Sequence, residues 1–245
     1  MRQHFENQDA LSHVINKRTQ GFLLESHGAE MPGYLAAGAE AAKETGVILL
    51  LTWALLTGLN ISFLPMGWAL LAMGGGWTVW KTARTAWLGW GRLERLHRIV
   101  EQEKYEIEHH RPQEREELIA LYRNKGFEGK LLEEVVSVLM ADQDRLLRVM
   151  LEEELGLTLQ VYDHPLKLSL GTLAGSFTAL LAAAFFFVFF PSFGILIASM
   201  SMLAAGAFLS AFYEKNRIIA ATIWNLAIGA LAFGVAYFVF GIVLW

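Results

Sequence analysis

The placement of the charged residues is the feature that most constrains how this chain can fold. Asp, Glu, Lys and Arg are absent from three long stretches, residues 45–80, 168–213 and 218–245, although 18% of all residues are charged. A helix that crosses the hydrocarbon core of a bilayer needs about 20 consecutive apolar residues. The second stretch is therefore long enough for two membrane-spanning helices, and the third is long enough for one.

The first charge-free stretch holds two spanning helices only if the second of them continues past Lys81 and Arg84. Such long side chains can extend to the membrane interface while their carbons stay in the apolar region. We therefore predict five transmembrane helices, with a re-entrant pair as the alternative for the first hairpin. The predicted spans are Gly46–Phe63, Met66–Trp87, Leu168–Phe190, Ser192–Phe212 and Ile218–Trp245.

The basic residues predict which ends of these helices share one side of the membrane. Lys and Arg occur before the first span, between the second and third, and between the fourth and fifth, but not in the turns near Pro65 and Pro191. Five spans place all three basic regions on one side, which the positive-inside rule assigns to the cytoplasm. We expect an integral membrane protein with a cytoplasmic N-terminus and its C-terminus on the opposite side. The membrane would be a bacterial inner membrane or a vacuole-type membrane.

Between the second and third predicted spans, the sequence changes to a charged, helical composition. One helix is expected to continue from the second span toward Pro112, which suits the first turn of a second helix. A third helix is expected from about Lys130 to Leu155, with Gly156 as its C-cap. The predicted fold is all-α and has four regions. They are an N-terminal cytoplasmic segment (1–45), transmembrane helices 1 and 2 (46–90), a three-helix cytoplasmic insert (91–165) and transmembrane helices 3 to 5 (166–245).

The insert contains acidic residues in a pattern that suits a metal ion. Two pairs of glutamates are each three residues apart, so the members of a pair share one helix face. Carboxylates on packed helices can bind a divalent cation, and a thioether favours Fe²⁺ or Mn²⁺ over Mg²⁺ or Ca²⁺. An ordinary solvated acidic face is the alternative interpretation of this spacing. The candidate metal ligands are Glu103, Glu106, Glu114, Glu117, Met150 and Glu154.

These residues lie in longer motifs. Glu103-x-x-Glu106-Ile is followed by Pro112-x-Glu114-x-x-Glu117-Leu, by Leu121-Tyr122-x(3)-Gly126-Phe127 and by Met150-x(3)-Glu154-Leu-Gly-Leu. The motifs resemble the vacuolar iron transporter family, over roughly residue 67 to the C-terminus. The resemblance implies a five-span homodimer that exports Fe²⁺ and Mn²⁺ from the cytoplasm through a pore between its two copies. It also implies that the six candidate ligands belong to a cytoplasmic metal-binding domain that collects the ion.

The membrane half departs from the family pattern. Where family members have Met-x-x-Gly-Glu in the second span, this chain has Met73, three glycines and Trp77, so Trp replaces the Glu. The predicted first span has no acidic residue, whereas family members have one there. An ion that crosses hydrocarbon needs polar ligands, and Met73 and Asn60 are the candidates to line its path.

These observations favour a divalent-metal transporter, with Fe²⁺, or Mn²⁺ or Zn²⁺, as the bound and transported ion. The alternative is a membrane-anchored iron-binding or sensing protein that does not transport, because the predicted spans lack acidic residues. A structural membrane protein whose acidic helices bind a protein partner is a third interpretation.

Other classes of protein are not expected. The chain has no Cys, which excludes disulfides and thiolate metal sites, and its net charge of −4 argues against nucleic-acid binding. Neither a Ser-His-Asp arrangement nor a phosphate loop is present, so we do not expect an enzyme. The N-terminus lacks the short apolar core of a signal peptide. Residues 1–45 receive no functional assignment.

Overall fold

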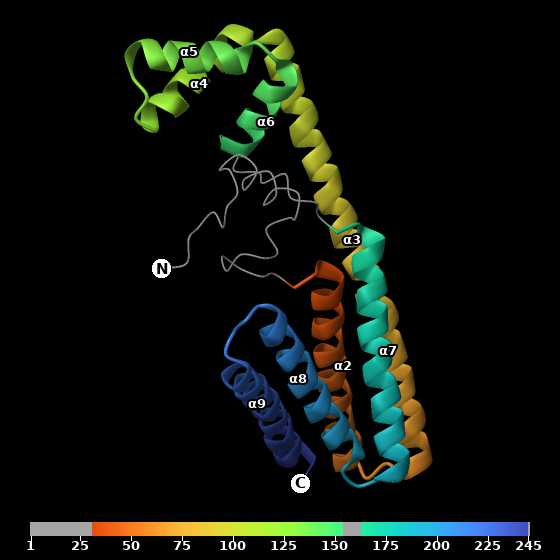
Figure 1. Cartoon of the computed structure of the whole chain (residues 1–245). Coiled ribbons are helices and arrows are strands. Elements are labelled where there is room, and N and C mark those ends of the chain that lie inside the picture. Colours follow the sequence, from red (N-terminus) through yellow and green to blue (C-terminus); the bar gives the residue numbers. More distant parts are fainter. Residues whose placement is uncertain (1–30, 154–162, 245) are drawn as a thin grey trace, which may run out of the picture. The chain divides into compact units, whose positions relative to one another are not determined.

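The computed structural model describes residues 31–153 and 163–244. These residues form eight α-helices and no strand, and the chain divides into two compact units (Figure 1). Met1–Trp87 and Asp163–Trp245 make up one unit, which we call the membrane unit, and Leu88–Tyr162 make up the other, which we call the charged unit. Helix α3 (Phe63–His109) is continuous over 47 residues and contributes to both units.

Four helices of the described residues are long and apolar enough to cross a bilayer. Three of them agree with the third, fourth and fifth predicted spans to within a few residues. The four are α2 (Gly33–Gly58), α7 (Pro165–Phe189), α8 (Gly194–Tyr213) and α9 (Ile218–Leu244), of which Ile218–Ile242 is the spanning part.

The first span differs from its prediction at both ends. Helix α2 begins at Gly33 rather than Gly46 and ends at Gly58 rather than Phe63. The prediction began the span after the last charged residue, but a charge does not end a helix. The segment after Pro32 is rich in Ala, a strong helix former, and it contains no Pro that would interrupt the helix. Part of the predicted N-terminal segment therefore belongs to α2.

The second predicted span, Met66–Trp87, lies inside α3. The prediction of one helix that continues from this span into the insert is confirmed. This part of α3 is not among the helices that are apolar enough to count as spans. Glycines 74–76 and the charged Lys81 and Arg84 lower its mean hydropathy. That Met66–Trp87 crosses the membrane, which would bring the spans to five, therefore stays a prediction.

Helix α2 packs against α7, α8 and α9 in the membrane unit (Figure 1). Its contact with α7 is a close backbone approach, because a Cβ built on Gly175 would lie 1.9 Å from the carbonyl oxygen of Gly38. On its other side, the Ser199 hydroxyl of α8 donates a hydrogen bond of 2.8 Å to the Gly46 carbonyl. Small residues at GxxxG spacing in α7 thus serve helix packing within one chain.

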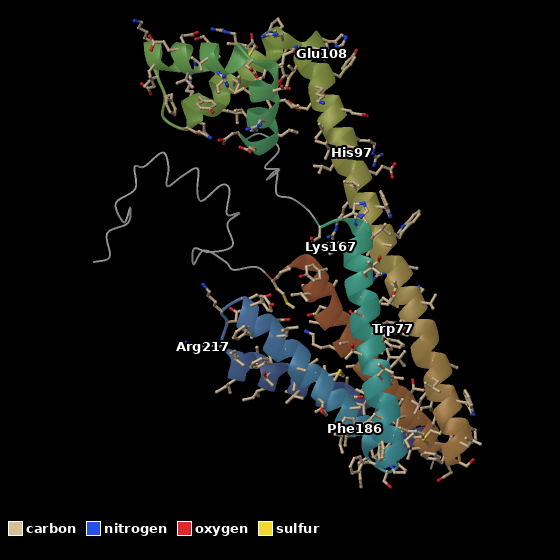
Figure 2. The ribbon with its side chains drawn as sticks, turned by 45° about the vertical axis from the view of Figure 1, so that its right-hand side comes forward. Trp77, His97, Glu108, Lys167, Phe186 and Arg217 are labelled. Carbon is tan, nitrogen blue, oxygen red and sulfur yellow. The ribbon has the colours of Figure 1, made fainter. Side chains whose placement is uncertain are left out.

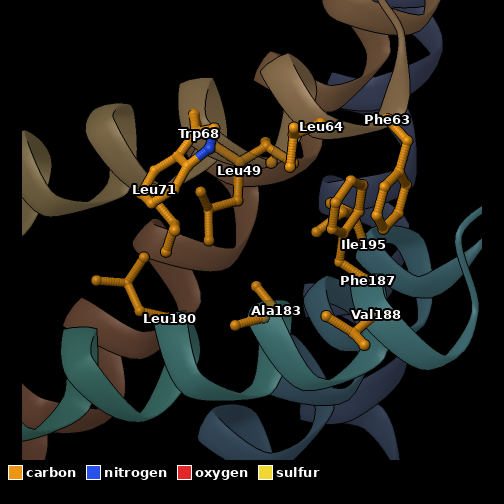
Figure 3. A pocket seen from close by; sticks show the side chains of 13 residues that line it. Leu49, Phe63, Leu64, Trp68, Leu71, Leu180, Ala183, Phe187, Val188 and Ile195 are labelled. Atoms are coloured by element: carbon orange, nitrogen blue, oxygen red, sulfur yellow. The ribbon is translucent and has the colours of Figure 1, made fainter.

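An apolar cavity of about 230 Å³ lies near the α2–α3 turn, between α2, α3 and α7. Side chains of α3, such as Trp68, face side chains of α7, such as Ala183, across it (Figure 3). No charged residue of the described chain lines this cavity. It therefore offers no ligands for an ion.

The charged unit contains one helix more than predicted after Gly126. The expected third helix is two helices, α5 (Gly129–Met140) and α6 (Gln143–Glu153). Asp142 causes the break, because its side chain accepts a hydrogen bond of 2.8 Å from the backbone amide of Arg145 and so caps α6. The predicted end of the third helix at Leu155, with Gly156 as its C-cap, lies outside the described residues.

A small apolar core holds the charged unit together. It brings residues of α3, α4 (Arg111–Asn124), α5 and α6 into one cluster. Pro112 lies in the first turn of α4, as predicted. The buried members of the cluster are Ile107, Leu118, Leu132, Val136, Leu146 and Met150.

Candidate metal site

The acidic pair on α3 lies toward the core of the charged unit. Glu103 is 5% exposed and Glu106 is half-buried. Glu103 shares a helix face with Ile107, because residues four apart lie above one another on a helix, whereas Glu106 directly precedes Ile107 and lies at the edge of that face. Ile107 is itself part of the apolar core. Gln102, one turn earlier on α3, donates a hydrogen bond of 3.0 Å to Glu106 Oε1.

The acidic pair on α4 is split by its surroundings. Glu114 is 3% exposed and lies one turn before Leu118, which is fully buried in the core. Glu117 is exposed. Glu114 is also in the first turn of α4, where backbone N–H groups stabilise a negative charge. The structure thus brings one glutamate of this pair to the core and leaves the other in solvent.

Met150, the predicted sulfur ligand, is fully buried on α6. It packs in the same cluster as Ile107 and Leu118, the residues one turn away from Glu103 and Glu114. The helices that carry the two buried carboxylates and the thioether are therefore joined by a single core.

Glu154, the sixth predicted ligand, lies outside the described residues. Within residues 31–153 and 163–244, no three His, Asp or Glu side chains are grouped closely enough to hold a metal ion. The six-residue site therefore stays a prediction. His109, three residues after Glu106, is exposed and stacks on Tyr105 with ring centroids 4.0 Å apart.

The two residues predicted to line the transport path are placed separately. Asn60 was predicted within the first span, but it lies in the turn after α2 with φ of 53°. Met73 lies on α3, and 51% of it is exposed. Ten residues of helix separate Met73 from the start of α3, which corresponds to about 15 Å. The structure does not bring these two side chains together.

Sequence reasoning missed the carboxylates of α2. Because α2 extends to Gly33, Glu40 and Glu44 lie within a helix that is able to span the membrane. The signal that could have found them is their spacing with Lys43, since residues 40, 43 and 44 share one helix face. The statement that the spans contain no acid is therefore wrong.

Glu40 and Glu44 line a pocket of about 410 Å³ in the membrane unit, which we call the polar pocket. Lys43 Nζ lies 2.5 Å from Glu40 Oε1 and 3.4 Å from Asn225 Oδ1 of α9. Lys81 of α3 forms an ion pair with Glu44. The pocket is also lined by Arg84, Trp77 and Trp80 of α3. Each carboxylate of the pocket is thus matched by a lysine.

The comparison with protein families decides what kind of chain this is. A model described as the VIT family matches residues 35–240, which include most of α2, the whole charged unit and nearly all of α9. The chain belongs to the vacuolar iron transporter (VIT) family. The resemblance seen in the motifs is confirmed. No curated protein matches the chain.

Members of the VIT family are membrane metal transporters rather than enzymes, and this VIT chain is an integral membrane protein. Its α3 has Trp77 where the family motif has Glu, whereas its α2 supplies Glu40 and Glu44 to the membrane unit. Carboxylates in this VIT chain therefore occur in both units, and those of the membrane unit are paired with lysines.

Proposed function

We propose that this VIT chain exports a divalent metal ion, Fe²⁺ or Mn²⁺, from the cytoplasm, and that its charged unit captures the ion. The observation that carries the capture proposal is the burial of Glu103 and Glu114. A solvated acidic face, the alternative interpretation, would leave both carboxylates in water. Two carboxylates beside an apolar core attract a divalent cation more strongly than solvated ones do, because the core screens their charge less than water.

The proposed capture site combines inner and outer ligands. Glu103 and Glu114 would hold the ion beside the core, with Met150 as the sulfur ligand that favours Fe²⁺ or Mn²⁺. Glu106 is half-buried and Glu117 exposed, so they would receive the ion from solvent. Glu154, four residues after Met150 in the sequence, would complete the set of ligands.

The proposed topology supports export. The segment Met66–Trp87 of α3 would be the second of five spans, which puts the basic regions and the charged unit on the cytoplasmic side. A homodimer would place the exposed Met73 of each copy at a shared interface, where the thioether can contact the ion. Asn60, in the turn at the far end of α2, would lie at the exit of the path.

A transport assay with matched variants tests both parts of the proposal. Purified wild-type chain in liposomes should take up Mn²⁺ or Fe²⁺ faster than empty liposomes do. The double variant Glu103→Gln/Glu114→Gln removes two buried charges and should lower uptake at subsaturating metal roughly tenfold, in line with the loss of metal-site partners. The control Glu108→Gln/Glu116→Gln removes two exposed charges from the same two helices and should behave as wild type; Glu108 is labelled in Figure 2.

Two results would contradict the proposal. Wild-type uptake equal to that of empty liposomes would remove the transport function. Equal loss of uptake in both double variants would remove the capture site at Glu103 and Glu114, because the effect would then follow from overall charge.

One observation favours a second function, a membrane-anchored metal-binding or sensing protein. The pairing of Glu40 with Lys43, and of Glu44 with Lys81, opposes a divalent cation in the membrane unit. Calorimetry on the full chain in detergent separates the two functions. Metal binding that Glu103→Gln/Glu114→Gln weakens, without uptake into liposomes, would support the sensing function.

A further inference from the structure

The polar pocket has more positive than negative side chains. Lys43, Lys81 and Arg84 line it together with Glu40 and Glu44. Both carboxylates are already paired with lysines, so the charge that remains is the guanidinium of Arg84. A pocket with this balance attracts an anion and repels a metal cation.

Among the residues that the structure describes, the ring of Trp80 holds the guanidinium of Arg84 in place. Its guanidinium carbon lies 5.4 Å from the centre of the Trp80 ring, a cation–π contact that leaves the N–H groups at the edge of the guanidinium available. Within the described residues, Arg84 forms no ion pair, and its side chain is exposed. A planar guanidinium matches two oxygens of a phosphate group.

The pocket also has an apolar part. The lining residues of α2, and likewise those of α3, follow one another at intervals of three or four positions or are adjacent. One face of α2 therefore lies opposite one face of α3. Val47, Ile48 and Leu203 continue the lining beyond the charged end. Trp77 and Trp80 lie among these residues, and indole rings are typical of the headgroup level of a membrane. A site that is cationic at one end and apolar along its wall matches a phospholipid.

We propose that the polar pocket binds the phosphate of an anionic phospholipid headgroup, with Arg84 as the principal contact. Lys81 lies one helical turn before Arg84 on α3. It can contact the same phosphate or keep its ion pair with Glu44. The acyl chains of the lipid lie along the apolar wall of the pocket, which a free phosphate ion would leave empty. This site goes beyond metal transport and does not depend on it.

The lipid site is tested on the full chain, without metal, by native mass spectrometry. Protein in mixed micelles with equal amounts of phosphatidylglycerol and phosphatidylcholine should retain phosphatidylglycerol preferentially. Arg84→Gln should lower that preference roughly fivefold, which is the effect expected from one basic residue near a lipid phosphate. Arg84→Lys keeps the charge and should retain most of the preference. Arg217→Gln is the matched control, because Arg217 is an exposed arginine of the membrane unit that does not line the pocket (Figure 2).

The other outcomes overturn the lipid site. Equal retention of the two lipids by the wild type would show that the pocket has no anion preference. An equal loss in Arg84→Gln and Arg217→Gln would assign the preference to overall charge. Full displacement of phosphatidylglycerol by millimolar inorganic phosphate or glycerol phosphate would show that the pocket takes the free anion rather than a lipid. Binding of Mn²⁺ that Glu40→Gln abolishes would show a cation site instead.

Discussion

Glu114 and Glu117 are one helical turn apart, yet the first is 3% exposed and the second lies in solvent. The difference follows from the register of α4, because Leu118 is fully buried and, of the two glutamates, only Glu114 shares its helix face. On α3, Glu103 and Ile107 show the same relation. Residues with one chemical character thus differ in burial according to the core residue one turn away.

The glycines of α7 make a second point at the residue scale and lead to a prediction. In Gly175→Ala the new Cβ would overlap the Gly38 carbonyl, so α2 and α7 must separate. We expect a loss of stability of about 1–3 kcal/mol, as is usual for overpacking, seen as a lower thermal unfolding temperature in detergent. Gly234→Ala is the control, since nothing lies within 4 Å of its Cβ position. Equal unfolding temperatures for the two variants would contradict the close packing of α2 and α7.

At the scale of the elements, the break between α5 and α6 shows how a local hydrogen bond can override periodicity. The apolar positions of residues 130–155 continue in helical register, so they favour a single helix. Asp142 competes with that pattern by capping the next helix. Arg111 donates a hydrogen bond of 2.6 Å to the Met140 carbonyl and Arg145 donates one of 2.9 Å to the Val138 carbonyl. The carbonyls at the end of α5 are thereby satisfied.

The cap leads to a prediction for α6. Asp142→Ala removes the acceptor for the Arg145 amide and should destabilise the start of α6 by about 1 kcal/mol. Hydrogen exchange of the peptide that covers Gln143–Glu153 should then be roughly fivefold faster. Asp144→Ala is the control, because it keeps the cap and loses only a charge in the first turn of the helix. Similar exchange in both variants would show that the cap does not define α6.

At the scale of the whole molecule, α3 decides how the two units are connected. It is one helix of 47 residues that contributes to both, and a hydrogen bond of 3.2 Å from Thr172 to Thr85 joins it to α7 within the membrane unit. No Pro interrupts α3 after its first turn. Whether its first part crosses the bilayer sets the side on which the charged unit lies, and with it the direction of transport.

The chain has no cysteine, so a single introduced Cys reports the side of the membrane directly. Variants Ser62→Cys and Asp142→Cys flank the part of α3 in question. If Met66–Trp87 spans the membrane, an impermeant maleimide should label them from opposite faces of sealed vesicles. Asn216→Cys should react on the same face as Asp142→Cys in either case, because α7 and α8 lie between them. Ser192→Cys and Asn216→Cys, which flank the spanning helix α8, form the control pair. Labelling of Ser62→Cys and Asp142→Cys from one face would exclude a membrane span at Met66–Trp87.

Much of the fold could be predicted because it depends on the composition of long segments. Helices α7, α8 and α9 agree with the charge-free stretches, and α4 has the predicted Pro112 in its first turn. The errors lie where a boundary depends on something other than charge. Glu40, Lys43 and Glu44 were placed before the first span because they are charged, but an Ala-rich helix continues through them. Asn60 was placed within that span, and α2 ends before it.

The candidate metal ligands illustrate the limit for the site. Their spacing predicted which glutamates share a face, and this follows from helix geometry alone. Burial of Glu103 and Glu114, but not of Glu117, depends on which apolar residues of α5 and α6 pack against α3 and α4. That packing involves residues far apart along the chain, so a local pattern does not reveal it.

The sequence by itself determined that this chain is a helical membrane protein of the VIT family with a charged insert, because the transfer of charge into hydrocarbon is costly wherever the charge stands. Only the tertiary structure decided which carboxylates are buried and which carboxylates form ion pairs with lysines. Lys43 and Asn225 are 182 positions apart but are joined by a hydrogen bond. The ion pair between Lys81 and Glu44 joins α3 to α2. Pairings of this kind arise when helices pack side by side, and helix packing depends on shape across the whole unit.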